Sequence, residues 1–563
     1  MARSIELGDD GPIDGLTSSG APHSIARAAL LIAVVTVLAR AAGFARVIVF
    51  ARIVGPSCLG DTYFTANTVP NIVFDIVAGG ALSSLVVPVI AGPAAMGDRE
   101  AVGRTTSALL TWAATLLVPV MLVGLLLTHP LMRLLVGSGH PGCSAATEVA
   151  VGSRMLAVFL PQVVIYAVAV VLIGVLQGHR RFLGPALGPL LSSLVVIAAY
   201  AVFAGAAGHD ENSLTHLTRA HELILSVGTT LGVASLIVPM LFPAVRIRLR
   251  LSPTYRFPPG IAERIRLMAI SGALVLGSQD LATAVVLRLA NARGTDGAVV
   301  LYNLAWTVFT VPWAVAAVPL ATSAFPGLTA AWQSGARDTY AAILARTTRV
   351  MVVVIGAAAA VMVATAGPVA RVVVLGAPGH VDPTVLVRGL VAFGLGLPGY
   401  ALVALMTRSL YAQGNARTPA TAAVAGWAVA IVADIVLAEL LPRAWTVAAV
   451  GIGTSIGVTV TGVWLLVAAA RSAGMHVLDG LARTAIGAAA GGVVAGFGGW
   501  LLAHPLPASG VLHNGLSAVV VAVASLAAYL VVAALIDRET IAVLGRRLVP
   551  IGRQAFAFGR RGG

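Results

Sequence analysis

The chain has 563 residues, of which 58% are hydrophobic and only 10% are charged. Soluble globular domains carry about 25% charged residues, so this composition excludes that class and indicates a polytopic membrane protein. The formal net charge is +14, and every basic residue counted in it is an arginine. The excess lies in short loops and at the C-terminus, which suggests contact with anionic lipid head groups and no nucleic-acid partner.

Helices that cross a bilayer need roughly 20 apolar residues each. The sequence predicts 14 such spans, near 27–48, 63–92, 105–128, 149–177, 184–207, 222–245, 267–291, 298–327, 346–367, 384–411, 419–440, 446–470, 482–503 and 514–536. Short amphipathic pieces near 130–136, 257–266 and 368–376 are predicted to lie along the membrane interface.

Arginine placement orients the predicted spans. Arginines concentrate in the loops that follow even-numbered spans, and the positive-inside rule then puts both termini in the cytoplasm. The polar segment 1–25 lacks the features of a signal peptide, so we expect it to stay cytoplasmic, as does the basic tail 538–563. Two cytoplasmic termini require an even number of spans, which 14 satisfies.

The chain also repeats itself. The stretch LPQVVIYAVAVVLIGVLQGHRRFLGP from Leu160 is echoed six spans later by LPGYALVALMTRSLYAQGNARTP from Leu397. An echo of even onto even spans indicates parallel repeats related by an axis along the membrane normal. We therefore predict an all-α polytopic fold with two pseudo-symmetric six-helix lobes, 26–250 and 251–475, followed by two C-terminal helices within 476–537.

Four prolines fall inside or at the mouths of the spans, and each is either a pivot for alternating access or a bend that shapes packing. They are Pro70, Pro161, Pro312 and Pro398.

Charged residues stand within the first two spans. Arg40, Arg46, Asp61 and Asp75 lie inside or at the ends of segments that are otherwise apolar. A charge at membrane depth is costly and normally faces a protein interior or a hydrated cavity, so it marks a pathway. The pattern favours a transporter with a wet interior.

Two cysteines, Cys58 and Cys143, fall in loops on the outer side of the predicted spans. A single pair makes no disulfide framework, so a bridge is one option and two unpaired thiols are the favoured expectation. The sequence shows no Cys and His cluster with metal-ligand spacing.

The N-terminal pattern resembles that of a known family. Arg40 is followed by Gly-Phe-x-Arg ending at Arg46, then by Asp61, by Pro-Asn ending at Asn71, and by Gly-Ala-Leu-Ser from Gly80. This pattern, with the span count and the repeat, is similar to the lipid II flippases of the MurJ (MviN) family. That family belongs to the multidrug/oligosaccharidyl-lipid/polysaccharide exporter superfamily. The resemblance implies carriage of a lipid-linked peptidoglycan precursor from the inner to the outer leaflet, through a central cavity between the lobes.

The resemblance implies candidate cargo-binding residues. The family's cavity arginine in the first span matches Arg40, and its Gly-Phe-x-Arg arginine matches Arg46. Its cavity-mouth aspartate matches Asp61, and the Pro-Asn motif supplies Asn71. Guanidinium groups suit a pyrophosphate because they bind phosphate oxygens in a bidentate fork. The alternative is that Arg40, Arg46 and Asp61 form structural ion pairs between the first two spans.

Several basic residues of better-known family members are missing here. Their positions hold Thr68, Phe74, Asp75 and Thr307. Either the cargo differs, or other arginines hold the head group, the candidates being Arg154, Arg288 and Arg408.

The resemblance also implies an ion site in the second lobe. Asp280, Asp434, Val450 and Thr454 match positions that bind sodium in some members, and the carboxylates could instead take a proton. Val450 and Thr454 are four residues apart and share a helix face. The alternative is a set of isolated polar residues satisfied by neighbouring helices.

No enzyme is predicted, because the sequence has no phosphate-binding loop and no paired-carboxylate site. We expect a multi-pass protein of the bacterial plasma membrane whose partners are lipid II, membrane lipids and proteins of cell-wall synthesis or division. The rival functions are a drug/cation antiporter of the same superfamily and a membrane scaffold that transports nothing.

Overall fold

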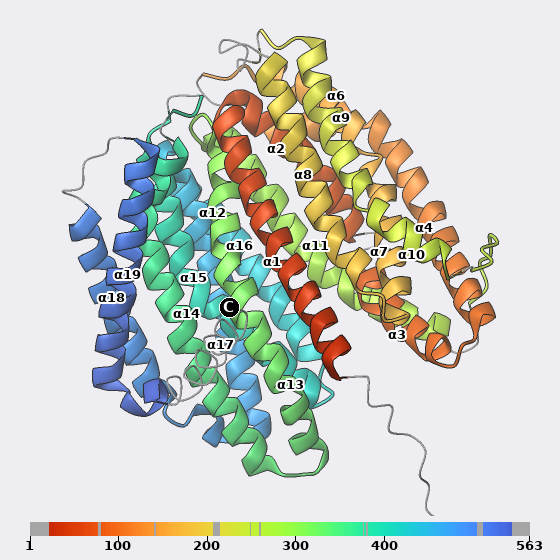
Figure 1. Cartoon of the computed structure of the whole chain (residues 1–563). Helices are drawn as coiled ribbons and strands as arrows, with labels where there is room; N and C mark the ends of the chain where they lie inside the picture. The colour runs from red at the N-terminus through yellow and green to blue at the C-terminus, as the bar shows by residue number, and fades with distance from the viewer. Residues whose placement is uncertain are drawn as a thin grey trace, which may run out of the picture.

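The described part of this computed structural model is helical throughout, with 13 helical stretches long and apolar enough to cross a membrane (Figure 1). The structure describes residues 22–76, 80–139, 142–206, 214, 216–247, 249–257, 261–374, 376–378, 381–503 and 510–542. The predicted all-α membrane fold is confirmed. Most of the predicted cytoplasmic segment 1–25 and of the tail 538–563 lies outside the described residues.

We call residues 22–257 the first half and residues 261–542 the second half. The first half contains α1 (Pro22–Ile53), α2 (Cys58–Phe74), α3 (Gly80–Ala95), α4 (Arg99–Leu126), α5 (Thr128–Val136), α6 (Ala145–Phe159), α7 (Gln162–Gly178), α8 (Leu183–Ala206), α9 (Arg219–Ser235) and α10 (Val238–Val245). The second half contains α11 (Ile261–Arg293), α12 (Ala298–Pro312), the π-helix η2 (Trp313–Ala317), α13 (Val318–Gln333), α14 (Arg337–Val374), α15 (Pro383–Ala412), α16 (Arg417–Leu440), η3 (Arg443–Trp445), α17 (Thr446–Ala473), η4 (Met475–Leu478), α18 (Leu481–Ala503) and α19 (Val511–Ile536).

The predicted span 63–92 corresponds to two shorter helices. α2 has 17 residues and α3 has 16, and residues 77–79 between them lie outside the described part. Each helix alone is shorter than the roughly 20 residues that cross a bilayer core. The other 13 predicted spans each match one helical stretch. The total of 14 therefore stays a prediction.

Two of the three predicted interfacial pieces are continuous with longer helices where the structure describes them. Residues 261–266 begin the 33-residue helix α11, and residues 368–374 end the 38-residue helix α14, while residues 258–260 and 375 lie outside the described part. Their position at the membrane interface stays a prediction. The piece at 130–136 is a separate helix, α5.

The four prolines differ in what they do to the backbone. Pro161 separates α6 from α7, and Pro312 stands where α12 changes into the π-helix η2. Pro70 and Pro398 lie inside continuous helices. A proline removes one backbone donor and crowds the preceding turn, so Pro161 and Pro312 mark the stronger interruptions.

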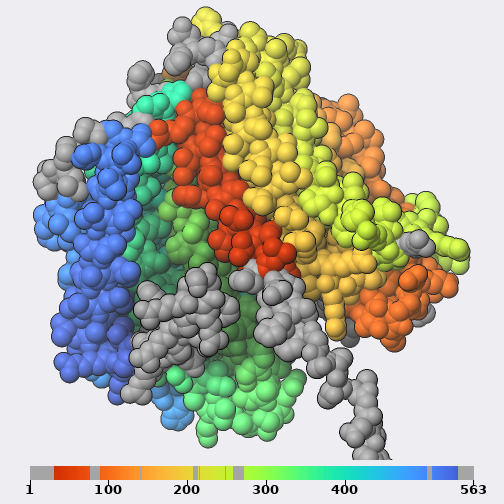
Figure 2. All heavy atoms as spheres, in the orientation of Figure 1, coloured from red at the N-terminus to blue at the C-terminus, as the bar shows by residue number. Residues whose placement is uncertain are grey.

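Helix α1 packs against both halves at once. Val47 and Ala51 join the apolar core of the second half, while Phe50 and Val54 join a core of the first half. Each pair is four residues apart, so two faces of one helix serve two cores. The space-filling view shows α1 (red) on the surface between α8 (yellow) and the green helices of the second half (Figure 2).

The cysteines are paired, so the expectation of two free thiols is wrong. Cys58 at the start of α2 and Cys143 before α6 form a disulfide with a Cα–Cα distance of 5.8 Å. This distance lies within the usual range for a bridge. Cysteine number alone could not reveal the pairing, because it depends on how α5 returns the chain to the start of α2.

Candidate functional site

Asp61, predicted at the mouth of a cavity, is fully buried between the two halves. Its Oδ1 accepts a hydrogen bond of 3.0 Å from the backbone N–H of Val300, in the first turn of α12. The residue before α12, Gly297, has a left-handed φ of +76° and offers no side-chain cap. A carboxylate near free N–H groups stabilises a helix N-terminus, so Asp61 of the first half caps a helix of the second half.

Further contacts surround Asp61. The Asn291 amide on α11 donates to Thr65 Oγ1 at 2.9 Å and to the Leu135 carbonyl at 3.3 Å. The Arg52 guanidinium donates to the Val372 carbonyl at the end of α14. Among the described residues, all hydrogen bonds between the halves lie at this one end of the molecule. We call this set, centred on Asp61, the inter-half contact.

Backbone packing tightens the inter-half contact. Gly297 lies so close to Pro56 that a Cβ would stand 2.3 Å from the Pro56 Cβ. Gly55, with φ +77°, would place a Cβ 2.4 Å from the Pro378 carbonyl oxygen. Both glycines need positive φ and the missing side chain. The two halves therefore meet backbone to backbone here.

The arginines of the first span do not pair with Asp61. Arg40 is exposed and Arg46 is half-buried on α1, and the described residues include no hydrogen-bond or ion-pair partner for either. The charge of Arg46 acts on the phenols of Tyr63 and Tyr200, which hydrogen-bond each other at 2.9 Å. The two arginines are thus available for a ligand, and the alternative of structural ion pairs with Asp61 is not what the structure shows.

The positions that lack the family's basic residues are satisfied locally. The Thr68 hydroxyl donates to the Phe64 carbonyl at 2.7 Å, and that of Thr307 to the Asn303 carbonyl at 2.8 Å. Phe74 is buried in an apolar core. The Asn71 amide also bonds its own helix, at the Asn67 carbonyl 3.3 Å away.

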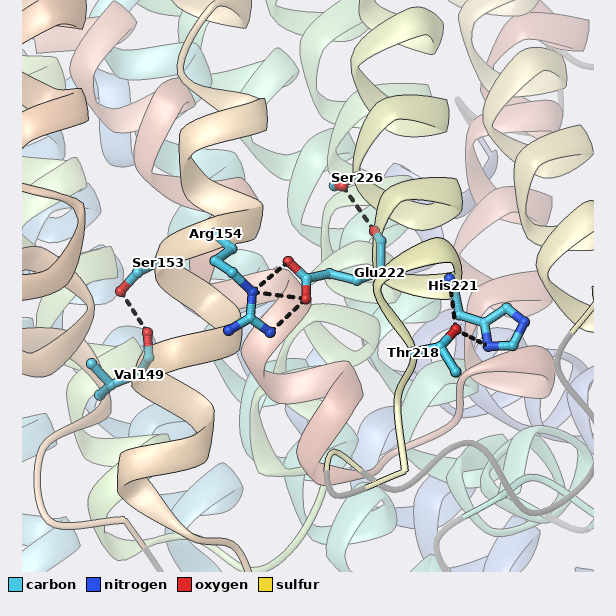
Figure 3. Close-up of polar contacts among 7 residues, drawn as sticks. All are labelled: Val149, Ser153, Arg154, Thr218, His221, Glu222 and Ser226. Carbon is cyan, nitrogen blue, oxygen red and sulfur yellow. Dashed lines mark hydrogen bonds and ion pairs between the residues drawn. The ribbon is translucent and has the colours of Figure 1, made fainter.

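Three arginines are proposed to replace the missing basic residues of the family, and one of them, Arg154, already forms an ion pair. Figure 3 shows its guanidinium from α6 meeting the Glu222 carboxylate from α9, with Nε at 3.0 Å from both oxygens and Nη2 at 2.6 Å from Oε2. Glu222 is 3% exposed, so the pair is a fixed structural contact within the first half. Sequence reasoning did not find Glu222, because its partner lies 68 residues away.

The other two substitutes bond backbone carbonyls. Arg288 Nη1 lies 3.5 Å from the Val136 carbonyl, within the inter-half contact. Arg408 is half-buried on α15, and its Nη1 donates to the Ala404 carbonyl of its own helix at 2.9 Å. A guanidinium has five N–H donors, so Arg408 keeps donors for a further acceptor.

Asp434 lies in a tight cradle between α16 and α17. It is 0% exposed, and neither carboxylate oxygen has a hydrogen-bond partner among the described residues. A Cβ on Gly453 would stand 2.0 Å from Asp434 Oδ1, so only glycine allows this approach. The adjacent Thr454 is buried and faces the carboxylate with its backbone, while Val450 is buried one turn earlier. The structure brings together Asp434 and Thr454 as predicted.

Asp280 has a different neighbour. It is buried on α11, its Oδ2 has no hydrogen-bond partner among the described residues, and the charge that acts on it is that of Asp75 at the end of α2. Asp75 stands where better-known family members have an arginine. The charge of Asp75, from the first half, therefore reaches Asp280 in the second half.

A long apolar groove opens on the second half, and no motif or periodicity in the sequence indicates it. It has a volume of about 1050 Å³ between η2, α13, α14 and α19. Its walls are almost wholly aliphatic, as with Leu320, Val354, Ala358 and Leu530, and Arg346 provides its positive charge. A groove of this length and polarity suits a hydrocarbon chain.

A comparison with protein families identifies the family of this chain. The family model described as "Lipid II flippase MurJ" matches residues 50–534. This chain belongs to the lipid II flippase MurJ family. Its match covers both halves and the C-terminal pair of helices α18 and α19.

Individual relatives agree with this membership. The chain is 25% identical over 413 residues to a probable lipid II flippase MurJ from Rhizobium tropici, covering 72% of this chain and 74% of that protein. It is 26% identical over 440 residues to the lipid II flippase MurJ of Burkholderia cenocepacia, covering 76% of this chain and 81% of the relative.

Solved structures show the same fold. An inward-closed conformation of a lipid II flippase MurJ matches 91% of this chain and 100% of its own length, with a TM-score of 0.69 and 17% identity. An inward-facing multidrug transporter of the MATE family matches 79% of this chain and 98% of its own length, with a TM-score of 0.62 and 16% identity. The fold is thus shared with these two solved transporters.

The cap on α12 generates a prediction. Asp61→Ala should lower the thermal stability of the purified chain by about 1–2 kcal/mol, the usual value of an N-cap acceptor, whereas Asp61→Asn keeps an acceptor oxygen and should lose less than half as much. Thermal unfolding in detergent measures both.

The matched control is Asp98→Ala, which removes an exposed N-cap of α4 inside the first half. It should cost a similar stability, because it also removes one N-cap acceptor. Equal losses for Asp61→Asn and Asp61→Ala would mean that the negative charge matters more than the acceptor, and would contradict the cap.

Proposed function

We propose that this chain carries lipid II from the inner to the outer leaflet of a bacterial plasma membrane by alternating access between its two halves. The observation that carries the proposal is the family match over residues 50–534. With both termini in the cytoplasm, as the arginine distribution favours, the inter-half contact faces outwards. The structure then corresponds to a state closed to the outside.

The arginines of α1 are proposed to hold the pyrophosphate of the cargo. Arg40 and Arg46 carry charge without a partner among the described residues, on the helix that packs against both halves. A guanidinium is less strongly hydrated than an ammonium and binds phosphate oxygens in pairs. Arg408 is a further candidate, because its helix bond uses only one of its donors.

The apolar groove is proposed to hold the polyprenyl chain of the cargo. Its volume of about 1050 Å³ lies against α14, which packs on α15 of the second-half core and on α18 and α19. A lipid whose head group crosses the protein needs a path for its tail beside it. Each CH₂ that leaves water for such a groove contributes about 0.8 kcal/mol.

A coupling cation, sodium or a proton, is proposed for the Asp434 cradle. The carboxylate is buried without a hydrogen-bond partner among the described residues, and a buried unpaired charge is costly unless a cation or proton neutralises it. Asp434, Thr454 and the Val450 carbonyl offer oxygen ligands, which suit a hard cation. Asp280, on α11, is the further candidate ligand, since α11 packs against α16 and α17.

Complementation tests the function. The chain should restore growth of a bacterium depleted of its own lipid II flippase, and lipid II should become accessible from outside in those cells. Arg40→Ala and Arg46→Ala should abolish both at normal protein level, because phosphate contacts are lost. The control Arg104→Ala removes an exposed arginine that pairs only with Glu100 at 3.8 Å, and it should complement fully.

Unchanged growth with Arg40→Ala and Arg46→Ala would remove the arginines from cargo binding. If the wild-type chain is inserted correctly, fails to complement and instead gives drug resistance, the antiporter function is supported, in line with the MATE-like fold.

Filling the groove should slow lipid transport. Ala358→Trp places an indole in the groove and should lower the transport rate roughly tenfold, because loss of contact with two CH₂ groups alone costs about 1.6 kcal/mol. The control is Val519→Trp on α19, outside the groove at a site that is 61% exposed. Equal transport by the two variants would show that the tail does not use the groove.

The cation site predicts a cation-dependent stability. Sodium should raise the unfolding temperature of the purified chain over that in choline, because a ligand that binds only the folded state stabilises it. Asp434→Asn should abolish this increase, and transport should lose its dependence on the cation. The control Thr421→Val removes an exposed hydroxyl of α16 that bonds only its own helix.

If Asp434→Asn leaves the sodium response intact, the cradle binds no sodium. If neither chain responds to sodium but transport by the wild type depends on pH and that of the variant does not, the neutralising ion is a proton.

A further inference from the structure

A small polar pocket lies in the first half, bounded by the turns and helix ends opposite the inter-half contact. It has a volume of about 240 Å³. Three segments far apart in the sequence form it: the turn between α3 and α4, the turn between α7 and α8, and the end of α10. Its charged lining residues are Asp98, Arg99, His179, Arg181 and Arg246.

The cations of this pocket are held in place. Arg181 Nη1 donates to the Pro243 carbonyl at 2.8 Å. The Arg246 guanidinium stacks over the Phe242 ring, 4.1 Å from its centroid. His179 Nδ1 lies 2.8 Å from the Val175 carbonyl, so the opposite ring nitrogen is left for another partner. Each of these contacts engages only part of the side chain and fixes its orientation, so that further N–H groups of Arg181 and Arg246 remain free to donate.

The turn that presents Arg181 contains a residue, Arg180, in an unfavourable backbone conformation. Arg180 has a φ of +58°, the left-handed region that glycine normally fills. The same pattern of closing hydrogen bonds ends α15, and there the left-handed position is Gly414, with φ +78°. In the first half an arginine takes this position, and it puts three consecutive basic residues, His179 to Arg181, into one turn.

The pocket has an excess of positive charge. Asp98 is its one carboxylate, and Asp98 Oδ1 already accepts the Ala101 N–H as the N-cap of α4. Three guanidinium groups therefore face one carboxylate, beside the positive end of the 28-residue helix α4. Such a site is suited to an anion with several oxygens, above all a phosphate.

The surroundings indicate a phosphate attached to a lipid. The volume of 240 Å³ equals that of about eight waters in the liquid, enough for a phosphate and part of the group it esterifies. Apolar side chains next to the cations in the sequence are exposed: Met96 by 78%, Phe182 by 44% and Phe242 by 65%. In a bilayer these side chains meet acyl chains, and basic pockets at the cytoplasmic side of membrane helices bind acidic head groups.

We propose that this pocket, formed by Arg99, Arg181 and Arg246, binds the phosphate of an anionic membrane lipid. The site is separate from the arginines of α1 and from the apolar groove. Its ligand would join α4, α7 and α10 at the end of the first half. The arginine distribution predicts this end to be cytoplasmic, where anionic lipids enrich the leaflet.

The test uses the full chain purified in detergent. Thermal unfolding and the number of retained lipids, counted by native mass spectrometry, are measured with phosphatidylglycerol, with phosphatidylcholine and with inorganic phosphate. The wild type should be stabilised by phosphatidylglycerol and little by the other two. The double variant Arg99→Gln/Arg246→Gln should bind phosphatidylglycerol about 25-fold more weakly, at about fivefold for each arginine near an anionic head group.

The matched control is Arg104→Gln/Arg417→Gln, which removes the same charge outside the pocket. Arg417, like Arg99, is the first residue of a helix, so the two double variants share their helix-terminal chemistry. The control should bind phosphatidylglycerol as the wild type does. A loss of equal size in both variants would reduce the effect to general electrostatics and overturn the proposal.

Two further results would also overturn it. Equal stabilisation by inorganic phosphate and by phosphatidylglycerol, lost together in the pocket variant, would show a site for free phosphate and not for a lipid. If the double variant does not fold, the exposed single change Arg99→Glu gives the answer, since binding of phosphatidylglycerol unchanged by it would exclude the pocket.

Discussion

The arrangement of the molecule depends on one buried contact, the Asp61 carboxylate against the first turn of α12. It is a helix cap whose two parts come from different halves of the chain. A helix is normally capped by the side chain of the residue that precedes it in the sequence. Because Gly297 supplies none, the N-terminus of α12 is completed only while the halves are together at this end. The capping of α12 therefore also joins the two halves of the chain.

The contact between Asp61 and α12 also carries an energetic cost. Asp61 Oδ2 has no hydrogen-bond partner among the described residues, so the carboxylate is only partly compensated for its removal from water. The bonds from Asn291 and Arg52 add a few kcal/mol at most, since a typical net hydrogen bond contributes about 1 kcal/mol. Gly55 and Gly297 let the two backbones approach closely at the same place, because neither adds a side chain between them. Under the proposed alternating access, opening this contact would have to cost no more than the few kcal/mol that separate two conformations of a protein.

Sequence reasoning predicted the features that local composition determines and missed those that depend on long-range packing. Thirteen spans, the short helix α5 and the proximity of Asp434 and Thr454 come from periodicity or from family motifs. The disulfide between Cys58 and Cys143 joins residues 85 positions apart. The Arg154–Glu222 pair is separated by 68 positions, and Asp61 is separated from Val300 by 239. No single sequence contains the register between such segments, so these contacts could not be foreseen.

The exchange of a family arginine for Asp75 changes the balance of charge around the boundary of the halves. The charge of Asp75 acts on Asp280, and two carboxylates in a low-dielectric region repel one another unless a cation or proton neutralises one of them. Arg46 remains on α1, and its charge also acts on Tyr166 beside that boundary, where Asp75 acts with the opposite sign. A phosphate-bearing head group drawn to Arg46 would therefore sit near acidic groups that favour a cation beside it. Under the proposed function, the attraction of the anion by Arg46 and the neutralisation of Asp75 and Asp280 would take place in one region, so that each would assist the other.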